Sequence, residues 1–208
     1  MGFIWQSGWR FGLLVAIGLS SAVMAVAETP LQLPVLWTVD TKTFLESQAS
    51  VADINGDGLD EIVAAGREEL IALDGMGVEL WRWRTKGRFM TYPAVYARAG
   101  TSALIFAADS SGWMSCVDGT GTERWHAQLD GPSSWSSSVV ADLDGDGAPE
   151  VVQTDETGAV WAFRAESGER VWKTALKGMP VSPAVADLDG DGRPEVVVCT
   201  NAGLLVVL

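Results

Sequence analysis

The chain has 208 residues, of which 48% are hydrophobic, with ten tryptophans, 23 glycines, two cysteines and a formal net charge of −13. This apolar content is sufficient for a buried core and excludes a disordered chain, while two cysteines are too few for a disulfide scaffold. The negative charge argues against nucleic acid and anionic membrane surfaces as partners.

Residues 1–27 are predicted to be a secretory signal peptide that is cleaved after Ala27. Arg10 precedes an uncharged run from Phe11 to Ala27, and Ala25-Val26-Ala27 has the small-x-small pattern of a cleavage site. An uncleaved anchor is the alternative, although the run is short for a membrane span and rich in Ala, Gly and Ser. We therefore expect a secreted or periplasmic protein with no membrane span in the mature chain.

Acidic strings of the form D-x-[DN]-G-D-G-x-x-[DE] recur along the rest of the chain. They begin at Asp53, Asp142 and Asp187, each just before an apolar run. The interval from Asp53 to Asp142 is twice the interval from Asp142 to Asp187, within one residue. One copy of the repeat is therefore missing between the first two acidic strings. Internal repeats of this length are typical of proteins built from stacked supersecondary units.

The missing copy lies at residues 92–106, which align with residues 182–196. Pro93-Ala94-Val95 matches Pro183-Ala184-Val185, and Gly100 matches Gly190. Ala97, Ala99 and Thr101 stand where the other copy has aspartates. The second copy therefore keeps the frame of the repeat without its carboxylates.

Tryptophans recur with the same period, at Trp37, Trp81, Trp125 and Trp172. The last three close segments that have an apolar run, a glycine-bearing turn and a polar strand, which is typical of a β-hairpin. In the third copy we predict strands at 137–141, 150–154, 159–165 and 170–174. The recurring tryptophan is interpreted as a packing residue between units.

Four short strands in each period, with no helical periodicity, predict an all-β chain built as a β-propeller from four-stranded antiparallel blades. A lone outer strand is expected at residues 35–40, and the fourth unit stops before its outer strand. The lone strand could close a four-bladed ring; the alternative, which we favour, is a fragment of a propeller with seven or eight blades. The propeller repeats span residues 28–208, with blades at about 48–85, 92–129, 137–175 and, incomplete, 182–208.

The acidic strings have the composition of calcium loops. Side-chain oxygens fall at positions 1, 3, 5 and 9, a backbone carbonyl is available at position 7, and glycines at positions 4 and 6 permit a tight turn. A hard divalent cation removes the repulsion between the carboxylates; Ca²⁺ suits such a set better than Mg²⁺, and the loops lack the His or Cys that Zn²⁺ prefers. An acidic hairpin turn without metal is the alternative. The sequence predicts up to three structural Ca²⁺ ions, bound by Asp53, Asn55, Asp57, Leu59 and Glu61, by Asp142, Asp144, Asp146, Ala148 and Glu150, and by Asp187, Asp189, Asp191, Arg193 and Glu195.

These strings resemble the calcium-binding FG-GAP (VCBS-type) repeats of integrin α-subunit propellers and their bacterial relatives. The segments that end at Trp81, Trp125 and Trp172 resemble the Trp-docking repeats of PQQ-dependent dehydrogenase propellers and of the outer-membrane assembly lipoprotein BamB. The resemblance covers about residues 35–208 and implies the propeller fold and the metal sites. It does not extend to quinoprotein activity, because adjacent cysteines and an evident Asp base are absent from the sequence.

We expect a non-catalytic, calcium-binding interaction module for a protein or polysaccharide, with no nucleic-acid partner. The single histidine, His126, lies beside Trp125 and is interpreted as structural, so no catalytic residue is assigned. The alternatives are a non-catalytic part of a larger enzyme, such as a quinoprotein or a polysaccharide lyase, and an assembly scaffold at the outer membrane.

Overall fold

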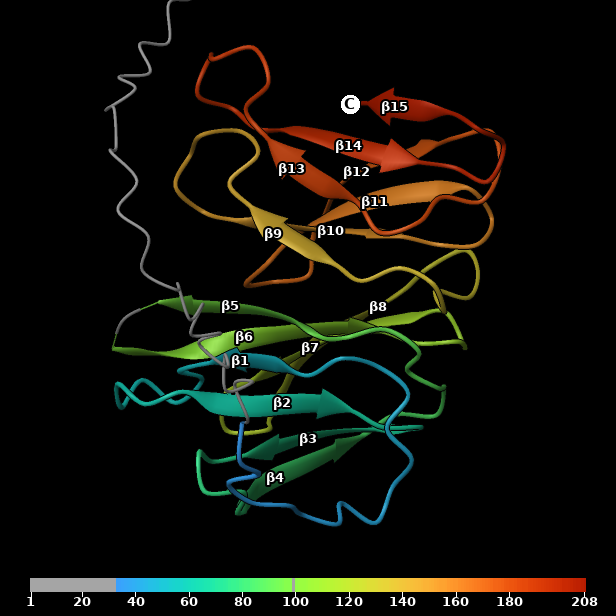
Figure 1. Cartoon of the computed structure of the whole chain (residues 1–208). Helices are drawn as coiled ribbons and strands as arrows, with labels where there is room; N and C mark the ends of the chain where they lie inside the picture. The colour runs from blue at the N-terminus through green and yellow to red at the C-terminus, as the bar shows by residue number, and fades with distance from the viewer. Residues whose placement is uncertain (1–32, 99) are drawn as a thin grey trace, which may run out of the picture. The chain divides into compact units, whose positions relative to one another are not determined.

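The computed structural model describes residues 33–98 and 100–208. Its compact unit Leu36–Leu208 is built from strands and turns (Figure 1). The other unit, Met1–Val35, contains the predicted signal peptide at residues 1–27, which lies outside the described residues. Residues 33–35 carry no regular secondary structure. In the described part of the chain, no helix is long and apolar enough to cross a membrane.

The strands form four antiparallel sheets, each a meander in chain order, which we call blades 1 to 4. This arrangement confirms the predicted all-β repeat of four strands, and blade 4 shows three. Blade 1 contains β1 (Ser50–Ala52), β2 (Glu61–Ala65), β3 (Glu69–Leu73) and β4 (Glu79–Arg84); blade 2 contains β5 (Ala94–Arg98), β6 (Thr101–Ala108), β7 (Trp113–Asp118) and β8 (Glu123–Gln128); blade 3 contains β9 (Val139–Ala141), β10 (Glu150–Thr154), β11 (Ala159–Arg164) and β12 (Arg170–Ala175); blade 4 contains β13 (Ala184–Ala186), β14 (Glu195–Cys199) and β15 (Leu205–Val207).

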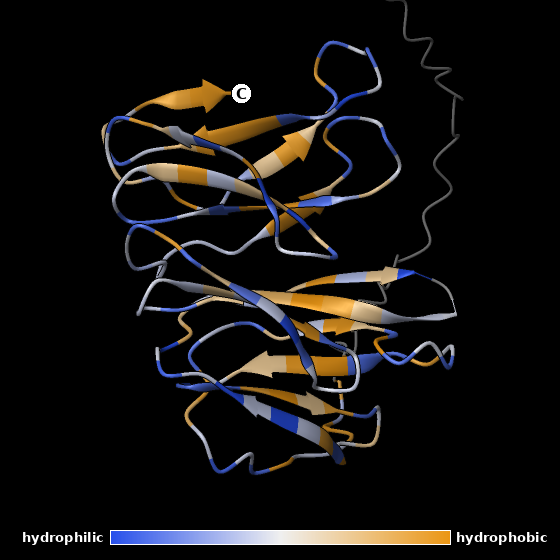
Figure 2. Ribbon diagram, turned by 180° about the vertical axis from the view of Figure 1, so that it is seen from behind, coloured by the Kyte–Doolittle hydropathy of each residue, from blue (hydrophilic) through white to orange (hydrophobic). Residues whose placement is uncertain are grey.

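The middle strands of blades 1 to 3 are buried on both faces. Every residue of β3 and β10 is buried, and β4 and β12, at the outer edge of their blades, are mostly exposed or half-buried. The hydrophobic colouring in Figure 2 is concentrated on the strands and the hydrophilic colouring on many of the connecting loops. A strand covered on both faces needs no polar alternation, which explains the continuous apolar runs in the sequence.

Each hydrophobic cluster joins two neighbouring blades. One contains Leu70 of blade 1 and Ile105 of blade 2, and the next contains Phe106 of blade 2 and Phe163 of blade 3. A third joins Val160 of blade 3 to Val196 and Val198 of blade 4. No blade encloses a core of its own, so the stability of each depends on burial against the next.

Three of the recurring tryptophans dock onto the hairpin turn of the following unit, which bears out their interpretation as packing residues. The indole Nε1–H groups of Trp37, Trp81 and Trp125 donate to the backbone carbonyls of Gly75 (3.1 Å), Gly119 (2.9 Å) and Ala165 (2.8 Å), respectively. These carbonyls occupy equivalent positions in the turns between the third and fourth strands. A buried indole pays a desolvation cost unless its N–H finds an acceptor, so the hydrogen bond fixes where each ring lies.

The same turns need a glycine beneath the ring. A Cβ at Gly168 would lie 2.5 Å from the indole of Trp125, and one at Gly121 would lie 2.8 Å from that of Trp81. Gly168 and Gly121 also have positive φ angles, 71° and 83°. Only glycine satisfies both the conformation and the close approach.

Residues 35–40, expected as an outer strand, carry no strand assignment. Trp37 docks onto the β3–β4 turn of blade 1 as Trp81 does in the next unit, and a Cβ at Gly77 would lie 3.0 Å from its ring. The tryptophan therefore keeps its period without a strand, because docking requires the indole and the turn but no ladder of backbone hydrogen bonds.

Trp172 is the recurring tryptophan that differs from the others. It is half-buried and lines a groove of about 380 Å³ together with Leu143, Pro194, Val196 and Leu208. Among the described residues, its Nε1 has no acceptor comparable to those of Trp81 and Trp125. Its contribution to stability should therefore be smaller.

We expect Trp125→Ala to lower the free energy of unfolding by about 3–5 kcal/mol, the range for truncating a buried aromatic residue. Trp125 is 9% exposed and contacts Phe106 and Phe163, and its indole N–H donates a hydrogen bond to the Ala165 carbonyl. Trp172→Ala is the matched control and should cost clearly less. Urea denaturation followed by circular dichroism measures both, and equal losses would contradict the docking role.

The two cysteines are free and differ in exposure. Cys116 is buried in the core, whereas Cys199, the last residue of β14, is exposed although it lies in an apolar run. Burial raises the pKa of the Cys116 thiol to about 12.

We expect maleimide at pH 7.5 to label one thiol in the native chain and two after denaturation, measured by mass spectrometry. Labelling that persists in Cys199→Ser under native conditions would show that Cys116 is accessible.

Candidate metal centre

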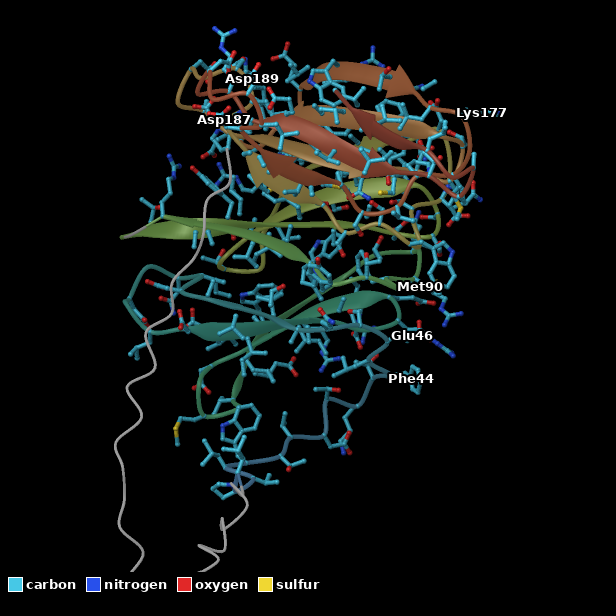
Figure 3. All side chains as sticks on the ribbon, turned by 45° about the horizontal axis from the view of Figure 1, so that its top comes forward. Phe44, Glu46, Met90, Lys177, Asp187 and Asp189 are labelled. Carbon is cyan, nitrogen blue, oxygen red and sulfur yellow. The ribbon has the colours of Figure 1, made fainter. Side chains whose placement is uncertain are left out.

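The acidic loops connect the first and second strands of blades 1, 3 and 4. We call them loop 1 (residues 53–60), loop 3 (142–149) and loop 4 (187–194), and each leads into the glutamate that begins the next strand. The first strands of successive blades contact one another, β1 with β5, β5 with β9 and β9 with β13. Asp187 and Asp189 lie close together on loop 4 in Figure 3.

Loop 4 shows how the carboxylates build the turn. Asp187 accepts hydrogen bonds from the backbone N–H groups of Gly190 (2.7 Å, Oδ1) and Gly192 (3.0 Å, Oδ2). Both glycines have positive φ angles, 82° and 89°, which turn their N–H groups inward toward the aspartate. The loop therefore wraps around the side chain at position 1.

Positions 3, 5 and 9 each use one oxygen in the same way. Asp189 accepts from Asp191 N–H (3.1 Å), Asp191 accepts from Arg193 N–H (2.8 Å), and Glu195 accepts from Leu188 N–H (2.7 Å). Loops 1 and 3 repeat these bonds at equivalent positions. In loop 4, one oxygen of each of these three carboxylates holds the loop, and the other has no hydrogen-bond partner among the described residues.

Three of the residues predicted as ligands in loop 4 are brought together. Carboxylate oxygens of Asp187, Asp189 and Glu195 lie within 4.8 Å of one another, as do those of Asp142, Asp144 and Asp146 in loop 3. The position-7 residues Leu59, Ala148 and Arg193 lie one residue before the end of their loops, and their N–H groups donate to the position-5 carboxylates. An all-oxygen set of this kind suits Ca²⁺.

A second observation, the lack of a counter-charge, favours a cation at loops 1 and 4. Glu61 is only 3% exposed, and Glu195 is half-buried. Neither forms an ion pair with a lysine or arginine of the described residues. In loop 1 the Nδ2 group of Asn55 donates to Asp57 (3.1 Å) and Glu61 (3.2 Å), which supplies hydrogen bonds but no positive charge. A buried carboxylate without a counter-charge is costly, and a bound divalent ion would remove that cost.

Loop 3 already contains a positive charge. The guanidinium of Arg164, in β11, contacts Asp144 (Nη2 to Oδ2, 2.9 Å), Asp146 (Nη1 to Oδ2, 3.2 Å) and Glu150. Burial raises the pKa of Glu150. Burial acts in the same direction on Asp144, but its hydrogen bonds from Asp146 N–H and Arg164 outweigh that effect and lower its pKa. The hydrogen bond to Asp144 also raises the pKa of Arg164.

The second copy, without carboxylates, forms a tight hairpin between β5 and β6. Arg98 pairs with Thr101 across the turn, and Gly100 has a φ angle of 73°; Ala99 lies outside the described residues. The connection between the first and second strands is formed by residues 97–103 in blade 2 and by residues 187–194 in blade 4, so it is one residue shorter in blade 2. The sequence alignment that matches Gly100 with Gly190 therefore shifts by one residue after the turn. Removing the acids therefore converts the loop into an extension of the strands.

His126 lies away from the acidic loops, in an aromatic groove between blades 1 and 2. Its Nδ1 lies 2.6 Å from Glu123, and its ring meets Trp113 edge-on at 4.9 Å between centroids. Trp83 and Lys86 also line this groove, whose volume is about 310 Å³. Aromatic rings next to charged groups are common in surfaces that bind other molecules.

The residue that sequence reasoning missed is Arg164. It occupies the position that Asp74 holds in blade 1 and Asp118 in blade 2, just before the turn that accepts the docked tryptophan. An alignment of the three hairpin segments shows this reversal of charge. The consequence of this reversal can be seen only from the register of the sheet, in which Arg164 pairs with Glu150 at the end of loop 3.

Comparison with protein-family models finds no match, and comparison with curated proteins finds none either. Solved structures do match. The crystal structure of BamB from Moraxella catarrhalis superposes with a TM-score of 0.62 at 16% identity, covering 83% of this chain and 52% of BamB. BBS1N, crystallised in complex with ARL6DN and soaked with lead, gives 0.59 at 13% identity, covering 82% and 54%, and the computationally designed Ika4 protein gives 0.58 at 12%, covering 81% and 92%.

These likenesses concern the fold. Together with the four antiparallel sheets and their shared cores, they identify the chain as a β-propeller-type repeat protein. The chain spans about half the length of the BamB and BBS1N chains that it matches.

We expect Gly56→Ala to destabilise the protein more than Gly190→Ala, at the same position of loop 4. Both glycines have positive φ angles, and such strain costs about 1–3 kcal/mol in each variant. A Cβ at Gly56 would also lie 3.1 Å from the backbone of Thr101 in blade 2, whereas nothing lies within 4 Å of one at Gly190. Thermal unfolding compares the two, and equal losses would contradict the contact between loop 1 and blade 2.

Proposed function

We propose that this protein is a secreted or periplasmic β-propeller that binds calcium through its acidic loops and serves as an interaction module for a protein or polysaccharide. The observation that carries the proposal is the repeated hydrogen-bond network of loops 1, 3 and 4. In each loop, side chains at positions 3, 5 and 9 hold the backbone with one oxygen, and in loop 4 carboxylate oxygens of Asp187, Asp189 and Glu195 lie within 4.8 Å of one another.

Calcium in this proposal has a structural role. The loops connect strands that contact one another between blades, and loop 1 rests on blade 2 through the hydrogen bond from Ala103 N–H to Ile54 O (2.9 Å). Without a cation, the carboxylates of each loop repel one another at short range. A bound ion would favour the folded loop over the unfolded chain, because only the folded loop assembles the ligands.

The interaction role is supported by the fold and by one surface feature. Propellers present concave surfaces and loops on a rigid scaffold, and the groove of Trp83, Trp113 and His126 adds aromatic contact area. BBS1N was crystallised with a protein partner, ARL6DN, which favours a protein ligand over a polysaccharide. The likeness to BamB, at 16% identity, concerns the fold and carries no assembly role by itself.

We also propose that the module is not an enzyme. The acids of the loops are engaged in holding the loop backbone, and His126 is engaged with Glu123 and Trp113. Export from the cytoplasm rests on the leader sequence, residues 1–27. The free calcium concentration outside the cytoplasm would be sufficient for sites of moderate affinity.

Calcium should raise the thermal midpoint of the protein relative to EGTA. Saturation of one site at a hundred times its Kd adds about 2.7 kcal/mol, which corresponds to a rise of about 5 °C or more for a chain of this size. Differential scanning fluorimetry with 2 mM CaCl₂, 2 mM MgCl₂ or 2 mM EGTA at constant ionic strength measures the effect. Mg²⁺ should give a smaller rise, and an unchanged midpoint in Ca²⁺ would refute the metal role.

A further inference from the structure

The three acidic loops share one sequence pattern but differ in what faces their carboxylates. In loop 3 the oxygens left over from the backbone hydrogen bonds are Asp144 Oδ2, Asp146 Oδ2 and one oxygen of Glu150. Arg164 contacts all three. Both oxygens of Asp142 accept backbone N–H groups, from Gly145 and Gly147. Every carboxylate oxygen of loop 3 therefore has a partner within the chain.

Loop 4 has the same backbone bonds and no such cation. The second oxygens of Asp189, Asp191 and Glu195 have no hydrogen-bond or ion-pair partner among the described residues. In loop 1 the corresponding atoms meet only the neutral amide of Asn55. No lysine or arginine pairs with the carboxylates of these two loops among the described residues, whereas Arg164 offsets part of the negative charge of loop 3.

The register of the hairpins explains the difference between loops 3 and 1. The backbone of Arg164 lies opposite Glu150, so its side chain extends over the end of loop 3. The equivalent residue of blade 1 is Asp74, which lines the same groove as Asn55, Asp57 and Glu61. A positive charge next to loop 3 and a negative charge next to loop 1 change the affinity of the two loops for a cation in opposite directions.

We propose that Arg164 is the resident cation of loop 3, so that this loop takes no calcium and the chain binds calcium at loops 1 and 4 alone. The proposal rests on the calcium-binding function proposed above. An arginine stays charged at any pH that the folded protein tolerates, and its planar fork contacts several carboxylates at once. A calcium ion could enter loop 3 only by displacing the guanidinium from three carboxylates, one of which, Glu150, is 1% exposed.

The test is the number of calcium ions bound by the full chain, measured by isothermal titration calorimetry after removal of metal with EGTA and dialysis. Wild type should bind two ions, and Arg164→Gln should bind three. Arg98→Gln is the matched control: it removes the same charge from an exposed pair with Glu166 (2.9 Å) and should leave the count at two. Circular dichroism verifies that each variant folds.

A second pair of variants does not depend on the folding of Arg164→Gln. Asp144→Ala and Asp189→Ala remove the same motif position from loops 3 and 4. The first should keep two ions, and the second should lose one.

The outcomes separate the two proposals. Three ions on wild type would support calcium binding and overturn the role of Arg164, as would two ions on a folded Arg164→Gln. No ion on wild type and one on Arg164→Gln would overturn the calcium function of the native protein and support the role of Arg164. No ion on either protein would overturn both.

Discussion

The fold depends on the burial of each sheet against the next. A single four-stranded blade has two apolar faces and cannot cover both, so every hydrophobic cluster is shared between two blades. The docked tryptophans set the spacing of this stack. Trp81 and Trp125 each reach from the outer strand of one blade to the turn of the next, where a carbonyl accepts the indole N–H and a glycine leaves room for the ring.

The acidic loops present the opposite physical problem, which is charge rather than apolar surface. Each loop folds its carboxylates inward to bond its own backbone, and this concentrates negative charge at the first turn of the blade. The chain resolves it differently in each copy. The β5–β6 turn of blade 2 has no acids and turns tightly through Gly100, Arg164 offsets part of the charge of loop 3, and the carboxylates of loop 4 lie close together without a lysine or arginine partner among the described residues.

Much of the fold was accessible from sequence, because the repeat exposes the same pattern several times. The strand at 150–154 and the turn glycines follow from local rules of alternation and conformation. Two features did not follow. The segment at 35–40 resembles a strand because it carries a recurring tryptophan, yet Trp37 docks through its side chain alone. Cys199 lies in an apolar run but is exposed, since which residues a blade covers depends on its neighbours.

The sequence by itself determined the repeat, the blade and the candidate metal ligands, because period, turn chemistry and ligand type are local properties of the chain. It could not separate three nearly identical loops. Only the tertiary structure decided that question, because Arg164 lies fourteen residues after Glu150 in the chain and meets it through the pairing of β10 with β11. Electrostatic interactions depend on distance in space, and a motif read along the chain does not contain the charges that the fold brings to it.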